Sequence, residues 1–188
     1  MKSISVYLGS SPGKGTKYCE AARELGRQMA LRGWRLVYGG AAVGTMEALA
    51  EGCLQNGGEC VGVFPVGFKG KPEVAAAGID VEKRNVGQTV YCANFSERKQ
   101  IMEDMGDCCV ALPGSWGTLD ELFTYATNTQ LGFNGGKKIF LLNLDGYYNT
   151  LKDMIQKMWE EGFIAEYGLH MLTFCDTLDD LLSHLEKI

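Results

Sequence analysis

Residues 110–123, with the sequence Val110-Ala111-Leu112-Pro113-Gly114-Ser115-Trp116-Gly117-Thr118-Leu119-Asp120-Glu121-Leu122-Phe123, predict a strand, a glycine loop and the start of a helix in direct succession. The run 108–112 is apolar without alternation, which is typical of a strand covered on both faces. Leu119, Leu122, Phe123 and Ala126 then recur at helical spacing. A strand followed at once by a loop and a helix is the repeating unit of α/β proteins.

The loop in this stretch has the composition of an anion site. Gly114 and Gly117 allow a ligand to approach the backbone closely. The free N–H groups and the dipole of the following helix favour a phosphate at its start, and Glu121 lies one turn inside. An alternative stays open at this point, because Thr118-x-x-Glu121 is also the pattern of a capping box.

Composition limits the class of protein. The chain of 188 residues is long enough for a sizeable core, and we expect a single domain over 1–188. The net charge of −5 argues against DNA or RNA as the main partner. No apolar run is long enough to span a membrane, and residues 1–4 lead directly into a strand without a signal peptide. We therefore expect a cytoplasmic protein.

The cysteines do not form a recognisable metal or disulfide pattern. There are seven of them and only two histidines, and no C-x-x-C pair is present. This spacing does not predict a zinc site. Most of the cysteines lie within apolar patterns, which favours reduced, buried thiols.

Two further glycine loops follow predicted strands. The loop 9–16 comes after the strand 4–8 and resembles a phosphate-binding loop, but three residues rather than four precede Gly13-Lys14, and Gly15 replaces the hydroxyl residue. A nucleoside triphosphatase is therefore not expected. The loop 39–44 comes after the strand 36–38 with the spacing G-G-x-x-x-G. It lacks the glycine that approaches the pyrophosphate, so an NAD site is not expected either.

The remaining elements complete an alternating pattern. Further strands are predicted at 60–64, 88–95, 139–142 and 171–175, and a loop with a short helix at 65–78. Helices are predicted from the apolar positions within 18–29, 46–53, 97–105, 119–131, 151–158 and 178–185. This alternation predicts one Rossmann-like α/β domain: a doubly wound, mostly parallel sheet with helices on both faces. Met154, Met158 and Trp159 are interpreted as core or subunit contacts rather than as a cofactor site.

Two cations are expected at an unfavourable place. If Ser96 caps the helix 97–105, Arg98 and Lys99 fall in its first turn, where cations oppose the helix dipole. Two such placements side by side indicate an anion nearby, and the alternative is a solvated basic face. Because the loops at Gly9, Gly39 and Gly114 would emerge at one edge of the sheet, we expect a site for a small phosphorylated molecule, with Arg98 and Glu121 as its charged pair.

Several motifs together resemble those of the LOG family, the cytokinin-activating nucleoside 5′-monophosphate phosphoribohydrolases, many of which carry the older label "possible lysine decarboxylase". The resemblance covers nearly the whole chain, from the Gly9-Ser10-Ser11 loop to 145–148. The motifs that carry it are Tyr38-Gly39-Gly40 with Gly44, Glu97-Arg98-Lys99 with Met102, Pro113-Gly114-x-x-Gly117-Thr118-x-x-Glu121, and Gln130-Leu131-Gly132.

The resemblance implies a homodimer without a metal or an organic cofactor. It implies Arg98 and Glu121 as catalytic residues. With the loops named above, it leads us to expect substrate contacts from Gly9, Ser10, Gly39, Gly40, Gly44, Lys99, Gly114, Ser115, Trp116, Gly117, Thr118 and Thr127. Two departures stand out: the family usually has glycine where this chain has Ser115, and often methionine where it has Phe95.

The expected function is hydrolysis of the N-glycosidic bond of a purine nucleoside 5′-monophosphate, of the cytokinin type or plain, to free base and ribose 5-phosphate. A lysine decarboxylase is not expected, because that chemistry usually needs pyridoxal phosphate on a lysine, and no lysine here stands out for that role. The alternative is a non-catalytic carrier or sensor of a nucleotide or a pterin-type phosphate, which the serine at position 115 keeps open.

Overall fold

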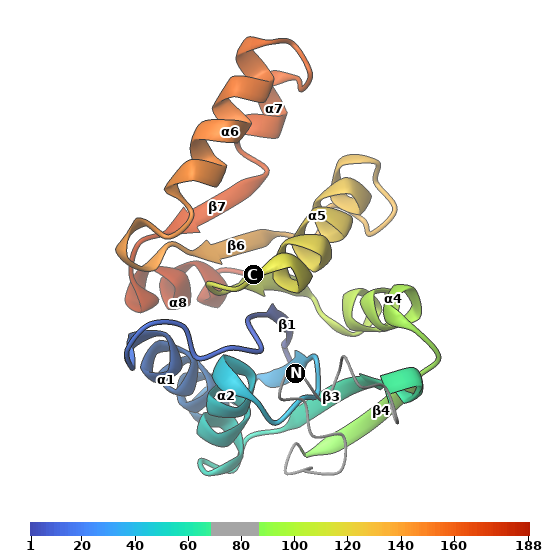
Figure 1. Cartoon of the computed structure of the whole chain (residues 1–188), viewed down its shortest axis with the longest axis vertical. Coiled ribbons are helices and arrows are strands. Elements are labelled where there is room, and N and C mark those ends of the chain that lie inside the picture. The colour runs from blue at the N-terminus through green and yellow to red at the C-terminus, as the bar shows by residue number, and fades with distance from the viewer. Residues whose placement is uncertain (69–86) are drawn as a thin grey trace.

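A parallel sheet forms the centre of the molecule (Figure 1). The structure, a computed structural model, describes residues 1–68 and 87–188. All the strand pairs in this part of the chain are parallel, and the strand order is β4-β3-β2-β1-β5-β6-β7. The strands are β1 (Ser3–Tyr7), β2 (Arg35–Tyr38), β3 (Cys60–Pro65), β4 (Gln88–Cys92), β5 (Cys108–Ala111), β6 (Ile139–Leu142) and β7 (Leu172–Cys175).

Helices follow the strands along the chain. They are α1 (Lys17–Leu31), α2 (Gly44–Leu54), α4 (Phe95–Met105), α5 (Trp116–Gln130), α6 (Asn149–Glu160), α7 (Glu166–Leu169) and α8 (Leu178–Glu186), with 3₁₀ turns at Val66–Phe68 and Leu144–Gly146. The doubly wound parallel α/β fold expected from the sequence is therefore confirmed. The short strand expected within 88–95 is β4, whereas α7 was not expected. Most of the loop predicted for 65–78 lies outside the described residues.

The sheet is covered on both faces, as its apolar strands require. Ile4 and Val6 of β1 pack with apolar side chains of α1, α2 and α8. Tyr7 and Cys109 point to the opposite face and pack with side chains of α4 and α5. Figure 1 shows the two groups of helices on opposite sides of the sheet.

The order of the strands creates a switch point between β1 and β5. Ile4 of β1 pairs with Leu36 of β2 on one side and with Cys108 of β5 on the other. From β1 the chain proceeds outward to β4, then returns to β5 and proceeds the other way. The chain continues after β1 and after β5 into helices on opposite faces of the sheet, α1 and α5. Open α/β sheets bind ligands in the crevice that such a switch point leaves at the carboxyl ends of the strands.

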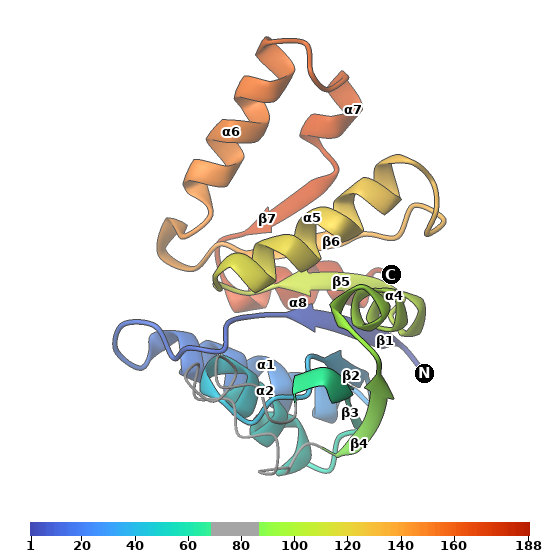
Figure 2. The same cartoon turned by 45° about the vertical axis from the view of Figure 1, so that its right-hand side comes forward.

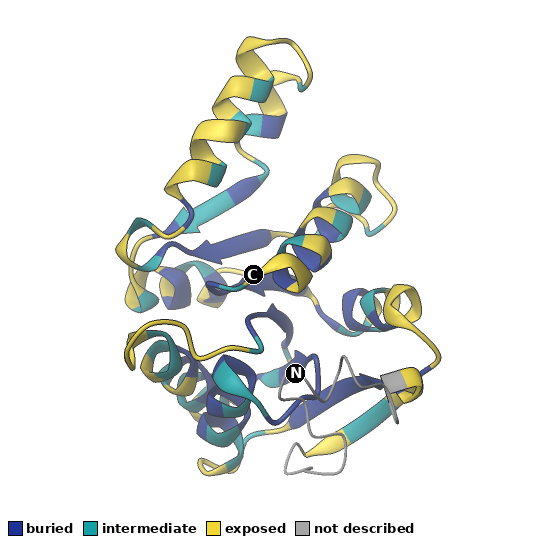
Figure 3. Ribbon diagram, viewed as in Figure 1, coloured by how far each residue is buried: buried dark blue, intermediate teal, exposed yellow. Residues whose placement is uncertain are grey.

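Helices α6 and α7 project from the body of the molecule in both views (Figure 2). No residue of α6 is buried, and Met154 is 57% exposed. Figure 3 shows this arm as largely exposed. Met154 and Trp159 are exposed, so the interpretation of these two residues as core residues is wrong. Met158 is only partly buried. A role in subunit contact stays a prediction.

All seven cysteines are unpaired, and every one except Cys19 is buried, so the expected reduced thiols are confirmed. Within residues 1–68 and 87–188, none of the helices has both the length and the apolar content of a membrane span.

The start of α4 differs from the prediction. The cap is Asn94, whose side-chain oxygen accepts a hydrogen bond from Glu97 N at 3.0 Å. The Glu97 carboxylate in turn accepts one from Ala93 N at 2.6 Å. Ser96 therefore lies inside the helix, and Arg98 and Lys99 are its fourth and fifth residues rather than members of the first turn. Asparagine caps helices as well as serine does, and here it comes two residues earlier.

Candidate active site

The loops after β1 and β5 meet at the switch point. A Cβ added to Gly9 would come within 3.4 Å of the Cα of Gly114, so the two backbones are in contact. Beside them lies a cavity of about 140 Å³. Its wall contains predicted residues from three loops and two helices, namely Ser10, Gly39, Arg98, Ser115, Gly117, Thr118 and Glu121, together with Leu8, Ala41, Met46 and Phe95. The chain thus brings together residues more than 100 positions apart.

Helix α5 begins earlier than a capping box at Thr118 would require. Ser115 is the N-cap residue, and its side chain makes no capping hydrogen bond. Thr118 is the third residue of the helix, and Glu121 forms an ion pair with Arg98 of α4. The capping-box alternative is therefore wrong, because the Glu121 carboxylate is held by another helix.

The start of α5 shares a property with two neighbouring helices. Among the described residues, no side chain caps α1 at Thr16, α2 at Val43 or α5 at Ser115. By contrast, α4 and α8 are capped by Asn94 and Thr177. Helix starts that follow β1, β2 and β5 face the ligand edge of the sheet, where uncapped N–H groups and the helix dipole favour an anion.

Arg98 and Glu121 form the charged centre of the cavity. Arg98 Nη1 lies 2.9 Å from Glu121 Oε1, and the two side chains are only 9% and 7% exposed. Burial raises the pKa of the Glu121 carboxyl, and the neighbouring Arg98 opposes this rise without cancelling it. A carboxylate with little water around it and a pKa nearer neutrality suits acid–base work or stabilisation of a developing cation.

The backbone around Arg98 is shaped to the guanidinium. Arg98 Nε donates a hydrogen bond to Val63 O at 3.0 Å, and its Cζ lies 5.5 Å from the centre of the Phe95 ring. A Cβ at Gly39 would come within 1.7 Å of Arg98 Nη2. Gly39 is therefore needed to make room for the guanidinium.

The cations of α4 are compensated by carboxylates of the protein. The Nζ of Lys99 donates hydrogen bonds to both carboxylate oxygens of Asp120 and to Thr124 Oγ1, each at 2.9 Å. The anion inferred from the position of Arg98 and Lys99 is thus supplied by Glu121 and Asp120 of α5. The interpretation as a solvated basic face is wrong for Arg98, which is buried.

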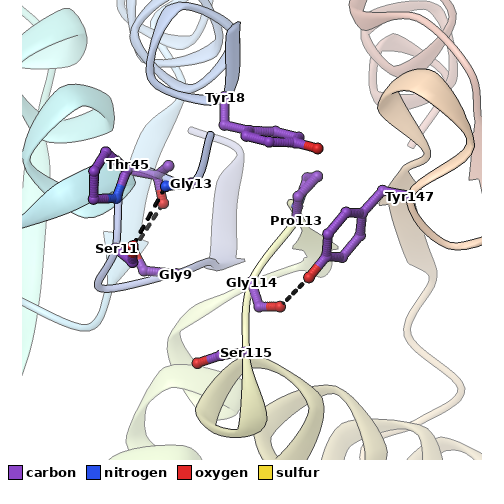
Figure 4. Close-up of a pocket in the computed structure, with 10 residues that line it drawn as sticks. Gly9, Ser11, Gly13, Tyr18, Thr45, Pro113, Gly114, Ser115 and Tyr147 are labelled. Atoms are coloured by element: carbon purple, nitrogen blue, oxygen red, sulfur yellow. Dashed lines mark hydrogen bonds between the residues drawn. The ribbon is translucent and has the colours of Figure 1, made fainter. Parts of the chain in front are cut away.

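Ser115 lines both the first cavity and a second one, of about 170 Å³. Figure 4 shows the second cavity. Gly9 and Gly114 are in its wall with Tyr18 and Tyr147. Tyr147 donates a hydrogen bond from its hydroxyl to Gly114 O, as Figure 4 shows. Tyr148 donates to Leu112 O at 2.7 Å. Two consecutive tyrosines therefore fasten the loop after β5.

The remaining predicted contacts do not line either cavity. A Cβ at Gly44 would come within 2.5 Å of Ser10 O, and one at Gly40, where φ is +74°, would be 3.2 Å from Gly62. These glycines permit the backbones around the site to approach one another. The Lys99 side chain is hydrogen-bonded to Asp120. Trp116, at the start of α5, is 87% exposed, and Thr127 lies on the exposed side of the same helix. Their roles stay predictions.

Sequence reasoning did not assign several residues that support the site. Met46 lines the cavity beside Arg98, and Thr45 donates a hydrogen bond to Gly9 O at 2.7 Å. Thr45 directly follows Gly44 and could have been found from that position. The roles of Tyr147 and Tyr148 depend on hydrogen bonds to residues more than 30 positions away, for which no local pattern exists.

One group of possible metal ligands occurs in the described part of the chain, away from the residues lining the two cavities. Ligand atoms of Cys175, Asp180 and His184 lie within 4.8 Å of one another. Burial raises the pKa of the Cys175 thiol to about 12, so the thiol is protonated at neutral pH.

The chain is similar to known proteins over most of its length. The model of the family described as "Possible lysine decarboxylase" matches residues 46–185. The cytokinin riboside 5′-monophosphate phosphoribohydrolase of Rhodococcoides fascians is 37% identical over 99% of this chain and 90% of its own length. An Arabidopsis thaliana enzyme of that name is 35% identical over 98% and 83%.

A similar fold occurs in a solved structure of lower identity. The molybdenum cofactor binding protein of Rippkaea orientalis has a TM-score of 0.71 and 20% sequence identity, over 99% of this chain and 96% of that one. At this identity the likeness concerns the fold alone. The family match and the two closer relatives show more: the chain belongs to the possible lysine decarboxylase family and, within it, to the LOG type, whose curated relatives are cytokinin riboside 5′-monophosphate phosphoribohydrolases.

Proposed function

We propose that this protein is a phosphoribohydrolase that cleaves the N-glycosidic bond of a purine nucleoside 5′-monophosphate and releases free base and ribose 5-phosphate. The observation that carries the proposal is the buried Arg98–Glu121 pair beside the uncapped start of α5. A carboxylate next to an anion site matches the two needs of this reaction, a held phosphate and a stabilised sugar cation. The names of the relatives support the same reaction class.

The mechanism follows from the charge that develops on the sugar. Breaking the bond between ribose and base creates an oxocarbenium-like transition state, as in other glycoside hydrolyses. The Glu121 carboxylate stabilises that positive charge and orients or deprotonates the attacking water. Arg98 holds Glu121 in place and binds substrate oxygens. The water adds to the sugar carbon, and the bonding electrons leave with the base, which takes up a proton.

The phosphate is assigned to the start of α5. Gly117 and Thr118 belong to the first turn of this helix and line the cavity with Ser10 and Ser115. The free N–H groups of Gly117 and Thr118 and the hydroxyls of Ser10, Ser115 and Thr118 match the acceptor oxygens of a phosphate. A ribose attached to that phosphate then lies next to Glu121, one helical turn deeper.

The protein is further proposed to act as a homodimer in the cytoplasm, as one domain over 1–188. Helix α5 has exposed apolar side chains on its outer side, with Phe123 47% and Leu131 61% exposed. Thr127 is on the same exposed side, where a partner subunit would meet it. The unpaired thiols favour a reducing compartment.

The experiment is incubation of the purified protein with AMP and with a prenylated adenosine 5′-monophosphate, followed by chromatography for free base. Release of base that is abolished in Glu121→Gln supports the proposal, because glutamine keeps the shape and removes the charge. Near-normal turnover by Glu121→Gln contradicts the role of the carboxylate. Binding of the nucleotide without release of base would instead favour the non-catalytic carrier.

A further inference from the structure

Two adjacent ion pairs connect α4 and α5 near the cavity. Consecutive residues of α4, Arg98 and Lys99, pair with consecutive residues of α5, Glu121 and Asp120, in reverse order. The inner pair is buried on both sides. In the outer pair the Lys99 side chain is 16% exposed and that of Asp120 57%. The outer pair therefore lies between the catalytic centre and the solvent.

Lys99 is fully engaged by the protein. An ammonium group has three N–H donors, and Lys99 directs its Nζ at Oδ1 and Oδ2 of Asp120 and at Oγ1 of Thr124, all at 2.9 Å. No donor is left for a ligand in this geometry. Thr124 is in turn fixed, because its hydroxyl donates to Asp120 O at 2.8 Å. Lys99 is thus placed to act on the site through Asp120 rather than by contact with substrate.

Asp120 is next to Glu121 in the chain, and two neighbouring carboxylates disfavour each other's ionisation. The charge of Lys99 compensates Asp120, as the charge of Arg98 compensates Glu121. From the other described elements packed against Glu121, the sheet contributes Tyr7 of β1 and Cys109 of β5. Burial raises the pKa of both side chains, so both are neutral at pH 7. The charges that act on Glu121 are therefore those of α4 and α5.

Below the ion pairs the two helices are connected again. The buried Glu103 of α4 accepts hydrogen bonds from Asn128 and Asn134, both at 2.6 Å. This contact holds α4 against α5 independently of Lys99. A change at Lys99 should therefore alter the charge beside Glu121 without separating the helices.

We propose that Lys99 and Asp120 form a positioning pair, in which Lys99 neutralises Asp120 and so keeps the neighbouring Glu121 ionised and paired with Arg98 for catalysis. The inference rests on the proposed function as far as catalysis is concerned. The pair touches neither the reacting bond nor the phosphate, and it acts through Glu121. Its effect should therefore be measurable as a change in the pH at which Glu121 ionises.

The first test is the pH profile of kcat/KM for base release from AMP. In Lys99→Met the charge of Asp120 is no longer compensated, which makes protonation of Glu121 easier. The acidic limb, the part of the profile where activity declines on acidification, should therefore move to higher pH by about half a unit to one unit. Asp120→Asn should move it the other way. The double variant Lys99→Met/Asp120→Asn should return close to wild type, and Lys99→Arg, which keeps the charge, should leave the limb in place.

The matched control is Lys157→Met, which removes a lysine that pairs with Glu161 on the projecting helix α6. It should leave the limb unchanged. An equal loss of kcat/KM at every pH in Lys99→Met and Lys99→Arg, with no displacement of the limb, would overturn the inference and indicate contact of Lys99 with substrate. Melting temperatures identify any variant that fails to fold.

A second readout does not need activity. In protein labelled with ¹³C at the glutamate carboxyls, the Glu121 resonance is identified by its absence in Glu121→Gln, and its titration is followed in wild type, Lys99→Met and Asp120→Asn. Opposite displacements in the two variants support the inference even if no base is released, in which case only the proposed function fails. Base release with identical Glu121 titrations in all three proteins would overturn the inference alone.

Discussion

The guanidinium of Arg98 occupies the space that a side chain at Gly39 would need. The separation of 1.7 Å between a Cβ at residue 39 and Arg98 Nη2 is far below any real contact. Gly39 lies just after β2 and Arg98 lies in α4. Because Gly39 has no side chain, the Arg98 guanidinium can occupy the space beside the end of β2.

Gly39→Ala should displace Arg98 and break its bond to Glu121. We expect kcat/KM for base release to fall by at least about tenfold, because one charge-assisted hydrogen bond is worth about 1.5–3 kcal/mol. The melting temperature should fall as well, since overpacking costs about 1–3 kcal/mol. The control is the same substitution in Arg98→Ala, where the space is empty: there Gly39→Ala should cost much less stability, and an equal cost would contradict the steric explanation.

Arg98→Ala should leave Glu121 buried without its partner and destabilise the protein by about 3–5 kcal/mol at neutral pH. The pKa of Glu121 is already raised by burial, and loss of Arg98 should raise it further. A group whose pKa is higher in the folded than in the unfolded state adds stability below its unfolded pKa and loses it as pH rises through the folded pKa. Urea unfolding from pH 5 to 8 should therefore show a stability deficit, relative to wild type, that grows with pH. A deficit independent of pH would show that Glu121 is not the group responsible.

In the proposed mechanism the ionised form of Glu121 is the catalytic one. Because burial raises its pKa, activity should decline on acidification at a pH above the range of an ordinary glutamate. The pH dependence of kcat/KM for AMP measures this limb. Glu121→Asp, which keeps the charge but shortens the side chain, should lower the rate and retain an acidic limb, whereas Glu121→Gln should lose the reaction.

The two tyrosines that fasten the loop after β5 should differ in importance. Tyr148→Phe removes the donor to the buried carbonyl of Leu112 and should cost about 1–3 kcal/mol of unfolding free energy. Tyr147→Phe removes a contact to Gly114 O at an exposed position and should cost less. Because Gly114 belongs to the proposed phosphate loop, we expect the Tyr147 variant to affect KM for AMP more than its stability. Chemical denaturation and steady-state kinetics separate the two effects.

The exposed side of α5 should be the surface of subunit contact. Phe123→Glu introduces a charge there and should convert the dimer to a monomer in light scattering after size exclusion. The comparison variant is Tyr167→Glu, at an exposed apolar position of α7. If the Tyr167 variant dissociates and the Phe123 variant does not, the projecting α6–α7 arm is the interface instead.

The fold could be predicted from the sequence because apolar runs and glycine loops are local signals. The strands at 60–64 and 139–142, for example, are found where the apolar runs place them. The helix starts were less predictable. Ser96 and Asn94 are both good caps, and the choice depends on Glu97 reaching back to Ala93 N. The Thr118–Glu121 spacing fits a cap equally well until the position of Arg98 is known.

The sequence could predict the charged residues of the candidate site, because their side-chain type indicates their chemistry. It could not predict contacts between residues that are far apart in the chain. Glu121 could be proposed from a carboxylate near a helix start. Arg98 could be proposed from a cation expected in a first turn, although the structure has it as the fourth residue of α4. The two lie 2.9 Å apart. The engagement of Lys99 by Asp120 and Thr124 was not visible, because it depends on the angle at which α4 and α5 pack. The same holds for the hydroxyl of Tyr148, whose acceptor lies 36 positions earlier.

If the phosphate binds at the uncapped start of α5, as proposed, the ligand also contributes to the order of this helix. A phosphate bound there would accept the hydrogen bonds that no side chain of the described residues accepts at Ser115. The amides of Gly117 and Thr118 should then exchange with deuterated solvent more slowly when ribose 5-phosphate is present. Product held at this place would also protect the helix from fraying, so that each turnover ends with the helix end returning to a looser state.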